Sequence, residues 1–361
     1  MKCSILKVAV PALLVAGFAL GQAQAPIFEL DPSWPKIPAK WKMGDASSIA
    51  VDKQDHLWIL SRPRTVPAAD AAKAAPPVTV FDASGNFIKS WGGDGPGYDW
   101  PQREHGILID GKGNVWIGGN NCAGRNLPGL KNVGDDQYLK FNQDGKFLLQ
   151  IGKPSGNTGN ADTKSFRQPA DASYYAKSNE VFFADGYGNH RVIVVDADTG
   201  AFKRMWGAYG KPPTDDKITY DAKVLPQQFN NPVHGIRMTN EGKIVLSDRG
   251  NNRIQVFEKD GKFIREYPLL RDTTAPGVTG STVFWIDKNQ SYWFTSDDPN
   301  GEVHIFRKSD GQIVGSFGRV GRGPGEFENL HNIGIDSKGN IYTAEVQGQR
   351  VQRFLYKGGL N

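Results

Sequence analysis

Short apolar strands alternate with polar turns along the whole chain. The same turn, similar to Asp/Asn-x-x-Gly, recurs eleven times. In six copies the turn comes before an apolar or aromatic run such as residues 115–117. In five interleaved copies it comes before a run such as residues 87–92. A turn of this kind between two apolar runs is typical of a β-hairpin. The pattern therefore predicts an all-β protein made of repeated hairpins.

Two hairpins make one four-stranded unit, and six such units at a spacing of roughly 50 to 65 residues predict a six-bladed β-propeller. The sixth unit is one strand short at the C-terminal end. We expect residues 27–30 to supply its outer strand, because closing the ring removes an exposed sheet edge. Residues 26–361 are then one propeller domain.

The first 25 residues have the pattern of an export signal. Lys2 and Lys7 precede an uncharged apolar run over residues 8–20, which is too short for a stable membrane anchor, and small residues follow. Cleavage is expected after Ala23 or Ala25. The mature protein is then periplasmic or secreted, has no membrane anchor, and is expected to be a monomer. It retains one cysteine, Cys122, so it forms no internal disulfide.

The net charge of the chain does not indicate a particular class of partner. The net charge of +5 falls to +3 once the signal is removed, and no run of Lys and Arg is interleaved with aromatic residues. Nucleic acid is therefore not an expected partner.

The long connections are predicted to lie on one face of the propeller. In a four-stranded blade both hairpin turns fall on one face, and the other two connections fall on the opposite face. Loops of this kind on a rigid scaffold commonly build a binding pocket. The alternative is that these long connections are surface insertions without a function. The long connections span residues 63–77, 92–104, 120–136, 153–168, 208–231 and 268–280.

Three of the six histidines occupy the same position in alternate repeats. His105, His234 and His331 each come two residues before the first inward apolar residue of an innermost strand, in blades 2, 4 and 6. The innermost strands line the axis, so these imidazoles are expected to converge there. Three neutral nitrogen ligands favour Zn²⁺ with a fourth position open for water or substrate. The remaining histidines, His56, His190 and His304, lack this register and are interpreted as structural.

The second strand of each blade ends on the same face as the three histidines. Arg62, Arg249 and Tyr187 lie at such ends. Two arginines beside a dication repel it unless an anion is present, which suggests a ligand that carries a carboxylate. A phenol at this place can serve as a base. The alternative for the two arginines is that they only form ion pairs with neighbours such as Asp248. The alternative for Tyr187 is that its ring only packs in the interior.

The runs Gly188–Val195 and Gly250–Phe257 resemble the NHL repeat. More particularly, the chain resembles the peptidyl-α-hydroxyglycine α-amidating lyases, which are six-bladed NHL propellers with a three-histidine zinc site. Their three Pro-His motifs resemble the runs that start at His105, His234 and His331. Their Asp-Gly-Tyr-Cys-Asn-x-Arg motif matches residues 185–191, which implies a catalytic role for Tyr187. Their Asp-Arg-x-Asn-x-Arg-Ile-Gln motif matches residues 248–255, which places one active-site arginine at Arg249 and leaves the other at Arg62.

The chain departs from that family at three positions. Gly188 and Val256 stand where the family has cysteines. The family's structural Ca²⁺ uses an aspartate directly after the third histidine, and Asn332 stands there in this chain. An amide oxygen can still ligate Ca²⁺, although it brings no charge.

The function implied is an exported zinc lyase that cleaves a carbon–nitrogen bond of an α-hydroxyglycine-like substrate and releases an amide and glyoxylate. The expected partner is therefore a small carboxylate-bearing or peptide-like molecule. Two alternatives stay open: a non-catalytic propeller that binds a ligand or protein through its loops, and a metal-dependent hydrolase on the same site.

Overall fold

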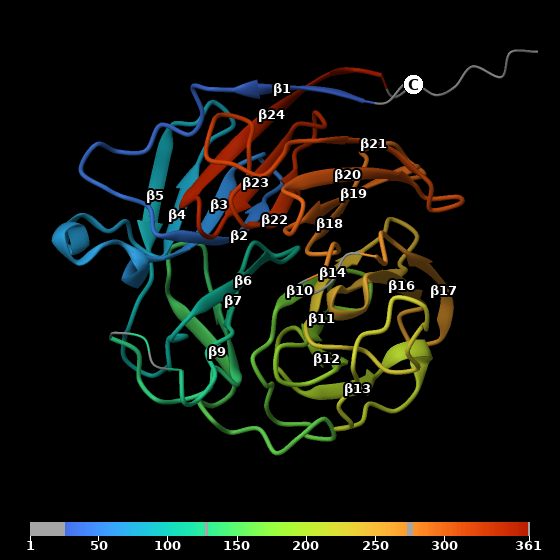
Figure 1. Ribbon diagram of the computed structural model, residues 1–361. Coiled ribbons are helices and arrows are strands. Elements are labelled where there is room, and N and C mark those ends of the chain that lie inside the picture. The colour runs from blue at the N-terminus through green and yellow to red at the C-terminus, as the bar shows by residue number, and fades with distance from the viewer. Residues whose placement is uncertain (1–25, 126, 128, 273–276, 360–361) are drawn as a thin grey trace, which may run out of the picture.

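Six four-stranded sheets surround a common axis as the blades of a propeller (Figure 1). This computed structural model describes residues 26–125, 127, 129–272 and 277–359. Neighbouring strands within every blade run antiparallel, and each of the eleven recurring turns joins two of them in a hairpin, as the sequence predicts. The predicted all-β, six-bladed fold is confirmed. The predicted export signal, residues 1–25, lies outside the described residues.

The blades follow the order of the chain, with the innermost strand first in each. Blade 1 contains β2 (Asp45–Val51), β3 (Leu57–Arg62), β4 (Val78–Phe81) and β5 (Phe87–Trp91). Blade 2 contains β6 (Glu104–Ile109), β7 (Val115–Gly119), β8 (Gln137–Phe141) and β9 (Phe147–Gly152). Blade 3 contains β10 (Asp171–Tyr175), β11 (Glu180–Asp185), β12 (Arg191–Asp196) and β13 (Phe202–Trp206).

The second half of the ring has the same plan. Blade 4 contains β14 (Val233–Met238), β15 (Ile244–Asp248), β16 (Arg253–Phe257) and β17 (Phe263–Pro268). Blade 5 contains β18 (Thr282–Phe284), β19 (Tyr292–Asp297), β20 (Glu302–Arg307) and β21 (Ile313–Phe317). Blade 6 contains β22 (Leu330–Ile335), β23 (Ile341–Glu345), β24 (Arg350–Gly358) and, from the other end of the chain, β1 (Ile27–Asp31).

The repeated turn is held by its leading aspartate. In blade 2, one carboxylate oxygen of Asp110 accepts the backbone N–H groups of Lys112 and Asn114, both at 2.9 Å. The other oxygen accepts the indole N–H of Trp116 at 3.0 Å. Gly113 takes the left-handed conformation, φ 84°, that closes the turn. The same side-chain pairing recurs at Asp52 with Trp58 and at Asp336 with Tyr342.

The hydrophobic core lies between adjacent blades. Phe182 and Trp206 of blade 3, for example, pack in one buried cluster with Ile244 and Phe257 of blade 4. Each blade buries both of its faces against its neighbours, so its central strands are apolar on both sides. The blades therefore hold one another in a fixed angular order around the axis.

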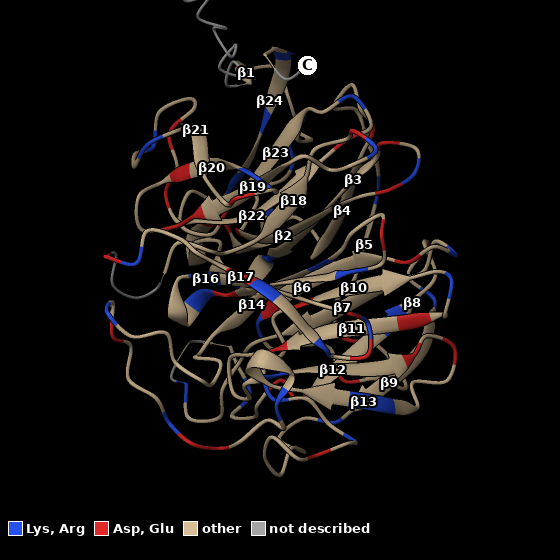
Figure 2. Ribbon diagram, turned by 90° about the vertical axis from the view of Figure 1, so that its right-hand side faces the viewer, with Lys and Arg blue, Asp and Glu red and all other residues tan. Residues whose placement is uncertain are grey.

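Strand β1 closes the ring. It pairs antiparallel with β24, with Leu30 opposite Phe354, and the two strands lie side by side at one edge of the ring (Figures 1 and 2). Arg353 of β24 contacts Asp31 of β1, with Nε 3.1 Å from Oδ2. The predicted closure by residues 27–30 is confirmed.

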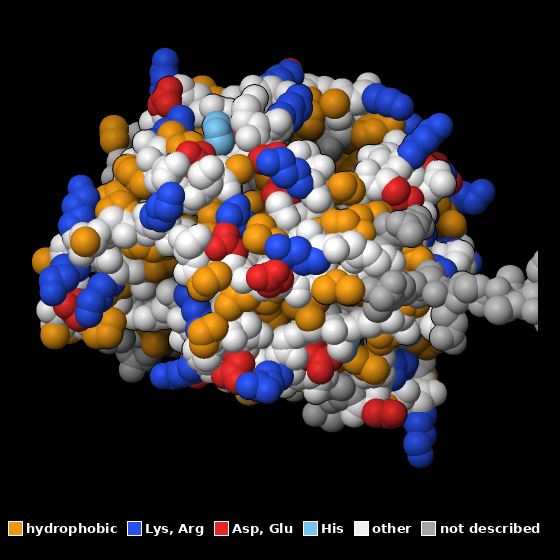
Figure 3. Space-filling model, turned by 90° about the horizontal axis from the view of Figure 1, so that it is seen from above, with side chains coloured by type: hydrophobic (Ala, Val, Ile, Leu, Met, Phe, Trp, Pro, Cys, Tyr) orange, Lys and Arg blue, Asp and Glu red, His pale blue; other side chains and the backbone are white. Residues whose placement is uncertain are grey.

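The long connections all lie at the face opposite the hairpin turns, as the antiparallel order of the strands requires. Among the described residues, three short 3₁₀ helices lie in them: η1 (Pro63–Thr65), η2 (Ala68–Lys73) and η3 (Ala208–Gly210). A fourth, η4 (Arg249–Asn251), lies in the short turn between β15 and β16 on the same face. We call this the loop face. Among the described residues no helix is long and apolar enough to cross a membrane. On the outer edge seen in Figure 3, basic and acidic side chains are interspersed.

Candidate metal centre

Each of the three histidines lies at an irregularity of an innermost strand. The pairing of β6 with β7 shifts register between Glu104 and Gly106, which leaves His105 out of the ladder. The pairing of β22 shifts in the same way around His331, and that of β14 shifts between Val233 and Ile236 around His234. A β-bulge of this kind re-aims the extra side chain. Here it turns three imidazoles toward the axis at the loop face.

The structure brings the three histidines together, as the alternate-blade register predicts. One ring nitrogen from each of them lies within 4.8 Å of the others. Nε2 of His234 is 3.2 Å from Nε2 of His331. All three side chains are buried, so the cluster lies inside the mouth of the channel.

The other ring nitrogen of each histidine donates a hydrogen bond to a backbone carbonyl of the next blade, and we call this bond the brace. Nδ1 of His105 donates to the carbonyl of Ala170 at 2.8 Å, Nδ1 of His234 to that of Gly280 at 2.8 Å, and Nδ1 of His331 to that of Ser47 at 2.6 Å. A carbonyl cannot donate, so each Nδ1 carries the hydrogen in these bonds. Each neutral imidazole therefore presents a bare Nε2 lone pair to the centre.

Glycine follows two of the histidines because the brace leaves no room for a side chain. A Cβ at Gly106 would lie 2.6 Å from the carbonyl oxygen of Ala170, and a Cβ at Gly235 would lie 2.8 Å from that of Gly280. These are the oxygens that accept from His105 and His234. Glycine therefore follows these two histidines because any larger residue would displace the carbonyl that accepts the histidine hydrogen bond.

Burial keeps the three imidazoles uncharged. It lowers the pKa of His234 to about 3, with the nearby Arg249 adding to the effect. Burial, and then the neighbouring histidines, hold the pKa values of His105 and His331 well below the usual range. Three neutral lone pairs that converge without a proton between them repel one another unless a cation lies among them. The donor set therefore fits a metal ion.

Tyr187 lies at the edge of this cluster. Its hydroxyl is 3.0 Å from Nε2 of His105 and 3.1 Å from Nε2 of His234. The connection from β11 to β12 carries it, and its backbone N–H donates to the carbonyl of Gln168 at 3.2 Å. Gly186 precedes it because a Cβ there would collide with the backbone of Val233. The tyrosine is thus fixed between blades 3 and 4 with its hydroxyl at the histidines.

Arg249 approaches the same hydroxyl from blade 4. One of its terminal nitrogens, Nη1, is 3.5 Å from the Tyr187 oxygen, and the other, Nη2, forms an ion pair with Asp298 at 3.0 Å. Asp248, the neighbour considered from the sequence, instead pairs with Arg253 at 2.7 Å. Arg249 is therefore aimed at the centre by a carboxylate of the next blade.

Arg62 has fewer hydrogen-bond partners for its guanidinium nitrogens than Arg249 has. Its Nε donates to the backbone carbonyl of Glu104 at 2.8 Å, but its two terminal nitrogens are buried without a hydrogen-bond partner. Nη1 is 3.5 Å from Asp45, an ion pair rather than a hydrogen bond. Burial, and then the positive charge of Arg103, lower the pKa of Arg62 to about 10, so it remains charged at neutral pH. Buried donors without partners point to an anionic ligand.

A cavity of about 590 Å³ opens beside Tyr187 on the loop face. Its wall includes Arg167, His190 and Lys217, together with four side-chain amides. His190, which the sequence analysis interprets as structural, is one of the residues that line this cavity. His304, in contrast, pairs with Asp297 at 2.7 Å, away from the three-histidine cluster.

Asn332 lies one residue beyond the third histidine, but its surroundings do not fit Ca²⁺. Its Oδ1 accepts the backbone N–H of Ile49 at 3.4 Å. The corresponding position of blade 3 carries a carboxylate, Asp171, which is engaged by Arg237. Calcium takes six to eight oxygen ligands that include free carboxylates. The described residues around Asn332 offer no such set.

Comparison with known proteins identifies the repeat. Residues 229–257 match the family model of the NHL repeat. The match spans β14, β15 and β16 of blade 4. The chain is 28% identical to NHL repeat-containing protein 3 of Mus musculus, an alignment that covers 91% of this chain and 84% of that protein.

Amidating enzymes are also among the relatives. Peptidyl-glycine alpha-amidating monooxygenase B of Xenopus laevis is 24% identical over 90% of this chain, which spans only 35% of that protein. A probable peptidyl-alpha-hydroxyglycine alpha-amidating lyase of Caenorhabditis elegans is 24% identical over 68% of this chain and 62% of its own length. Among solved structures, a streptogramin B lyase superposes with a TM-score of 0.55 at 14% identity, covering 93% of this chain and 99% of that one. That last likeness concerns the fold.

Proposed function

We propose that the protein is a zinc-dependent lyase that cleaves the carbon–nitrogen bond of an α-hydroxyglycine-like substrate, giving an amide and glyoxylate. One observation carries the proposal: the Tyr187 hydroxyl lies within hydrogen-bond distance of two of three converging histidine nitrogens. The amidating relatives support it, because their sequences align with 90% and 68% of this chain, each at 24% identity.

Zinc is the metal that the donor set favours. The separation of 3.2 Å between Nε2 of His234 and Nε2 of His331 is close to the ~3.3 Å expected for two tetrahedral ligands of zinc. Three neutral imidazoles with a fourth position open are typical of catalytic zinc. Bound there by His105, His234 and His331, zinc supplies Lewis-acid polarisation of a substrate hydroxyl.

Tyr187 is the proposed proton carrier. Its oxygen accepts the proton of the substrate hydroxyl, and its own proton passes to the amide nitrogen, as the carbon–oxygen double bond of glyoxylate forms. The electron pair of the breaking carbon–nitrogen bond leaves with that nitrogen. Arg249, with Nη1 3.5 Å from the Tyr187 oxygen, helps to hold that oxygen in position during the transfer.

Arg62 is the proposed anchor for the substrate carboxylate. Its two terminal nitrogens form a planar fork without a hydrogen-bond partner, which matches the two oxygens of a carboxylate. The acyl part of the substrate would extend into the cavity of about 590 Å³ beside Tyr187. The cavity wall contains four side-chain amides, two cations and the carboxylate of Asp215, and these groups suit a peptide-like chain.

The proposal includes export to the periplasm or the exterior, with the chain acting as a monomer on a small substrate. A binding propeller without catalysis is the second candidate, because the relative that this chain covers at 84% of its length has the name NHL repeat-containing protein 3, which states a repeat and no activity.

The deciding experiment measures glyoxylate release from an α-hydroxyglycine-terminated peptide by the zinc-loaded protein. Tyr187→Phe should reduce kcat by about 10² to 10⁴, the usual range for a lost general acid–base group, while zinc content stays unchanged. Tyr98→Phe is the matched control, since the Tyr98 hydroxyl bonds the Gly93 carbonyl of a loop on blade 2. Release by the wild type no faster than by zinc in buffer would reject the lyase and favour the binding propeller.

A further inference from the structure

The cavity beside Tyr187 has a cation fixed in its wall. Arg167 lies near the end of the connection over residues 153–168, and it is one of the residues that line this space of about 590 Å³. Its backbone N–H donates to the carboxylate of Asp185 at 2.8 Å, and its carbonyl accepts the N–H of Gly188 at 3.0 Å. These two bonds hold Arg167 beside the residue that directly follows Tyr187.

Gly188 leaves room for the arginine side chain. A Cβ at Gly188 would collide with Cγ of Arg167 and would lie 2.8 Å from its Cδ. The amidating lyases that the chain resembles have a cysteine at this position. The stem of Arg167 therefore occupies the space that a side chain at residue 188 would need, and both residues line the cavity.

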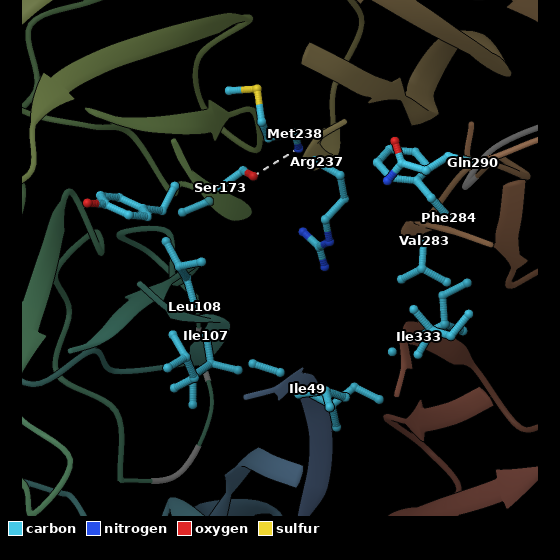
Figure 4. Close-up of a pocket in the computed structure, with 17 residues that line it drawn as sticks. Ile49, Ile107, Leu108, Ser173, Arg237, Met238, Val283, Phe284, Gln290 and Ile333 are labelled. Atoms are coloured by element: carbon cyan, nitrogen blue, oxygen red, sulfur yellow. Dashed lines mark hydrogen bonds between the residues drawn. The ribbon is translucent and has the colours of Figure 1, made fainter. Parts of the chain in front are cut away.

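The guanidinium of Arg167 is available to a ligand. Among the described residues it forms no hydrogen bond and no ion pair, and the same holds for the ammonium group of Lys217, the second cation of the wall. Arg237 in the axial channel differs. Its side chain extends into the open space of about 350 Å³ drawn in Figure 4, but apolar side chains surround it and it already pairs with Asp171.

The charges of the cavity wall favour an anion. Oδ1 of Asp215 accepts the backbone N–H of Asn160 at 3.0 Å and its side-chain amide at 2.8 Å. These bonds, with the charge of Arg167 adding to them, hold the pKa of Asp215 below its usual range, so this carboxylate is ionised. Burial lowers the pKa of His190, which is therefore neutral at pH 7. Two cations against one carboxylate leave the wall with a net positive charge.

We infer that Arg167 is a specificity-determining residue, which selects substrates that carry an acidic side chain on the residue before the hydroxyglycine. A carboxylate there matches the planar fork of the guanidinium. The inference rests on the proposed function for the placement of the substrate, with the hydroxyglycine carboxylate at Arg62 and the acyl part in the cavity.

Two peptides that differ by one charge test the inference. They end in Glu-α-hydroxyglycine and Gln-α-hydroxyglycine, and glyoxylate release by the zinc-loaded protein gives kcat/KM for each. The wild type should favour the Glu peptide by about 10-fold, the lower end for one charge-assisted hydrogen bond, because Arg167 is exposed. Arg167→Gln should abolish this preference, and it keeps the side-chain carbons that lie against Gly188.

Lys164→Gln is the matched control. Lys164 is an exposed residue of the same connection and lies outside the residues that line the cavity. Its loss changes the net charge of the protein by the same amount, so it should leave the preference for the Glu peptide intact. An equal loss in Lys164→Gln and Arg167→Gln would show that the preference comes from long-range charge and would overturn the inference.

A binding measurement separates this inference from the proposed reaction. Peptides that end in Glu-Gly and Gln-Gly lack the hydroxyl that the lyase needs, and calorimetry with the zinc-loaded protein gives their affinities. Tighter binding of the Glu-Gly peptide by about 10-fold, lost in Arg167→Gln, would support the inference even if no glyoxylate were released and the lyase were rejected. Equal affinities of the two peptides, binding of neither, or a preference that survives in Arg167→Gln would overturn it.

Discussion

The contact between Asp31 and Arg353 should stabilise the closed ring in a pH-dependent way. Asp31 ends β1, the strand that completes blade 6, and its carboxylate receives Ser33 and Arg353. Burial of the carboxyl opposes ionisation, but the hydrogen bonds from Ser33 and Arg353 outweigh it and lower the pKa of Asp31 to about 2, against 3.8 for the free group. The ionised form is therefore the one that holds β1 to β24.

The magnitude follows from that difference. A pKa of about 2 in the folded state and 3.8 in the unfolded state corresponds to about 2.4 kcal/mol of stability at neutral pH. The pair lies near the surface, so screening by water and salt should reduce this to about 1 kcal/mol. Because the folded pKa is the lower one, the contribution is complete above about pH 5, falls to about half by pH 3, and disappears below pH 2.

Urea unfolding of the wild type and Asp31→Asn, followed by tryptophan fluorescence, measures the effect. The variant should be less stable by about 1 kcal/mol at pH 7, and the difference should roughly halve at pH 3. Asp144→Asn is the control: Asp144 also pairs with a basic side chain, that of Lys89, but its own side chain is 79% exposed, so no measurable change is expected. A difference between Asp31→Asn and the wild type that stays constant from pH 7 to pH 3 would refute the reasoning.

Two further predictions concern the candidate site. Arg62→Met should raise KM for an α-hydroxyglycine substrate by about 10- to 100-fold and leave zinc content intact, because a charge-assisted fork to the carboxylate is lost; an unchanged KM would remove Arg62 from substrate binding. Gly106→Ala should weaken zinc binding by about 10- to 100-fold in a chelator competition, because its Cβ would displace the carbonyl that braces His105. His105→Ala should abolish binding in the same assay, whereas Gly334→Ala, whose Cβ would meet only apolar side chains, should not change it; equal affinity of Gly106→Ala and wild type would show that the brace is unimportant.

The repeated part of the molecule could be predicted from the sequence because each blade repeats one turn and one register. The aspartate turn, the count of six blades and the closing strand all follow from local spacing. The convergence of His105, His234 and His331 follows from the same spacing, since alternate blades of a six-fold ring place equivalent residues around one axis.

Contacts between blades could not be predicted in this way. The carbonyls that brace the histidines are backbone atoms of Ser47, Ala170 and Gly280, and a carbonyl leaves no trace in residue identity. The pairing of Arg249 with Asp298, and the place of His190 in a cavity wall, depend on how connections of different blades fold over one another. The sequence analysis singled out Arg249 and His190 without indicating which residues they would contact.

The hydrogen bond from His331 joins the last blade of the chain to the first. His331 donates to the carbonyl of Ser47, so the third imidazole is held in place by a residue made almost three hundred positions earlier. During synthesis the chain therefore presents at most two oriented imidazoles until its final blade has emerged and docked on the first. An ion held by all three imidazoles could therefore bind only after the ring has closed, and its binding would report a chain that has finished folding.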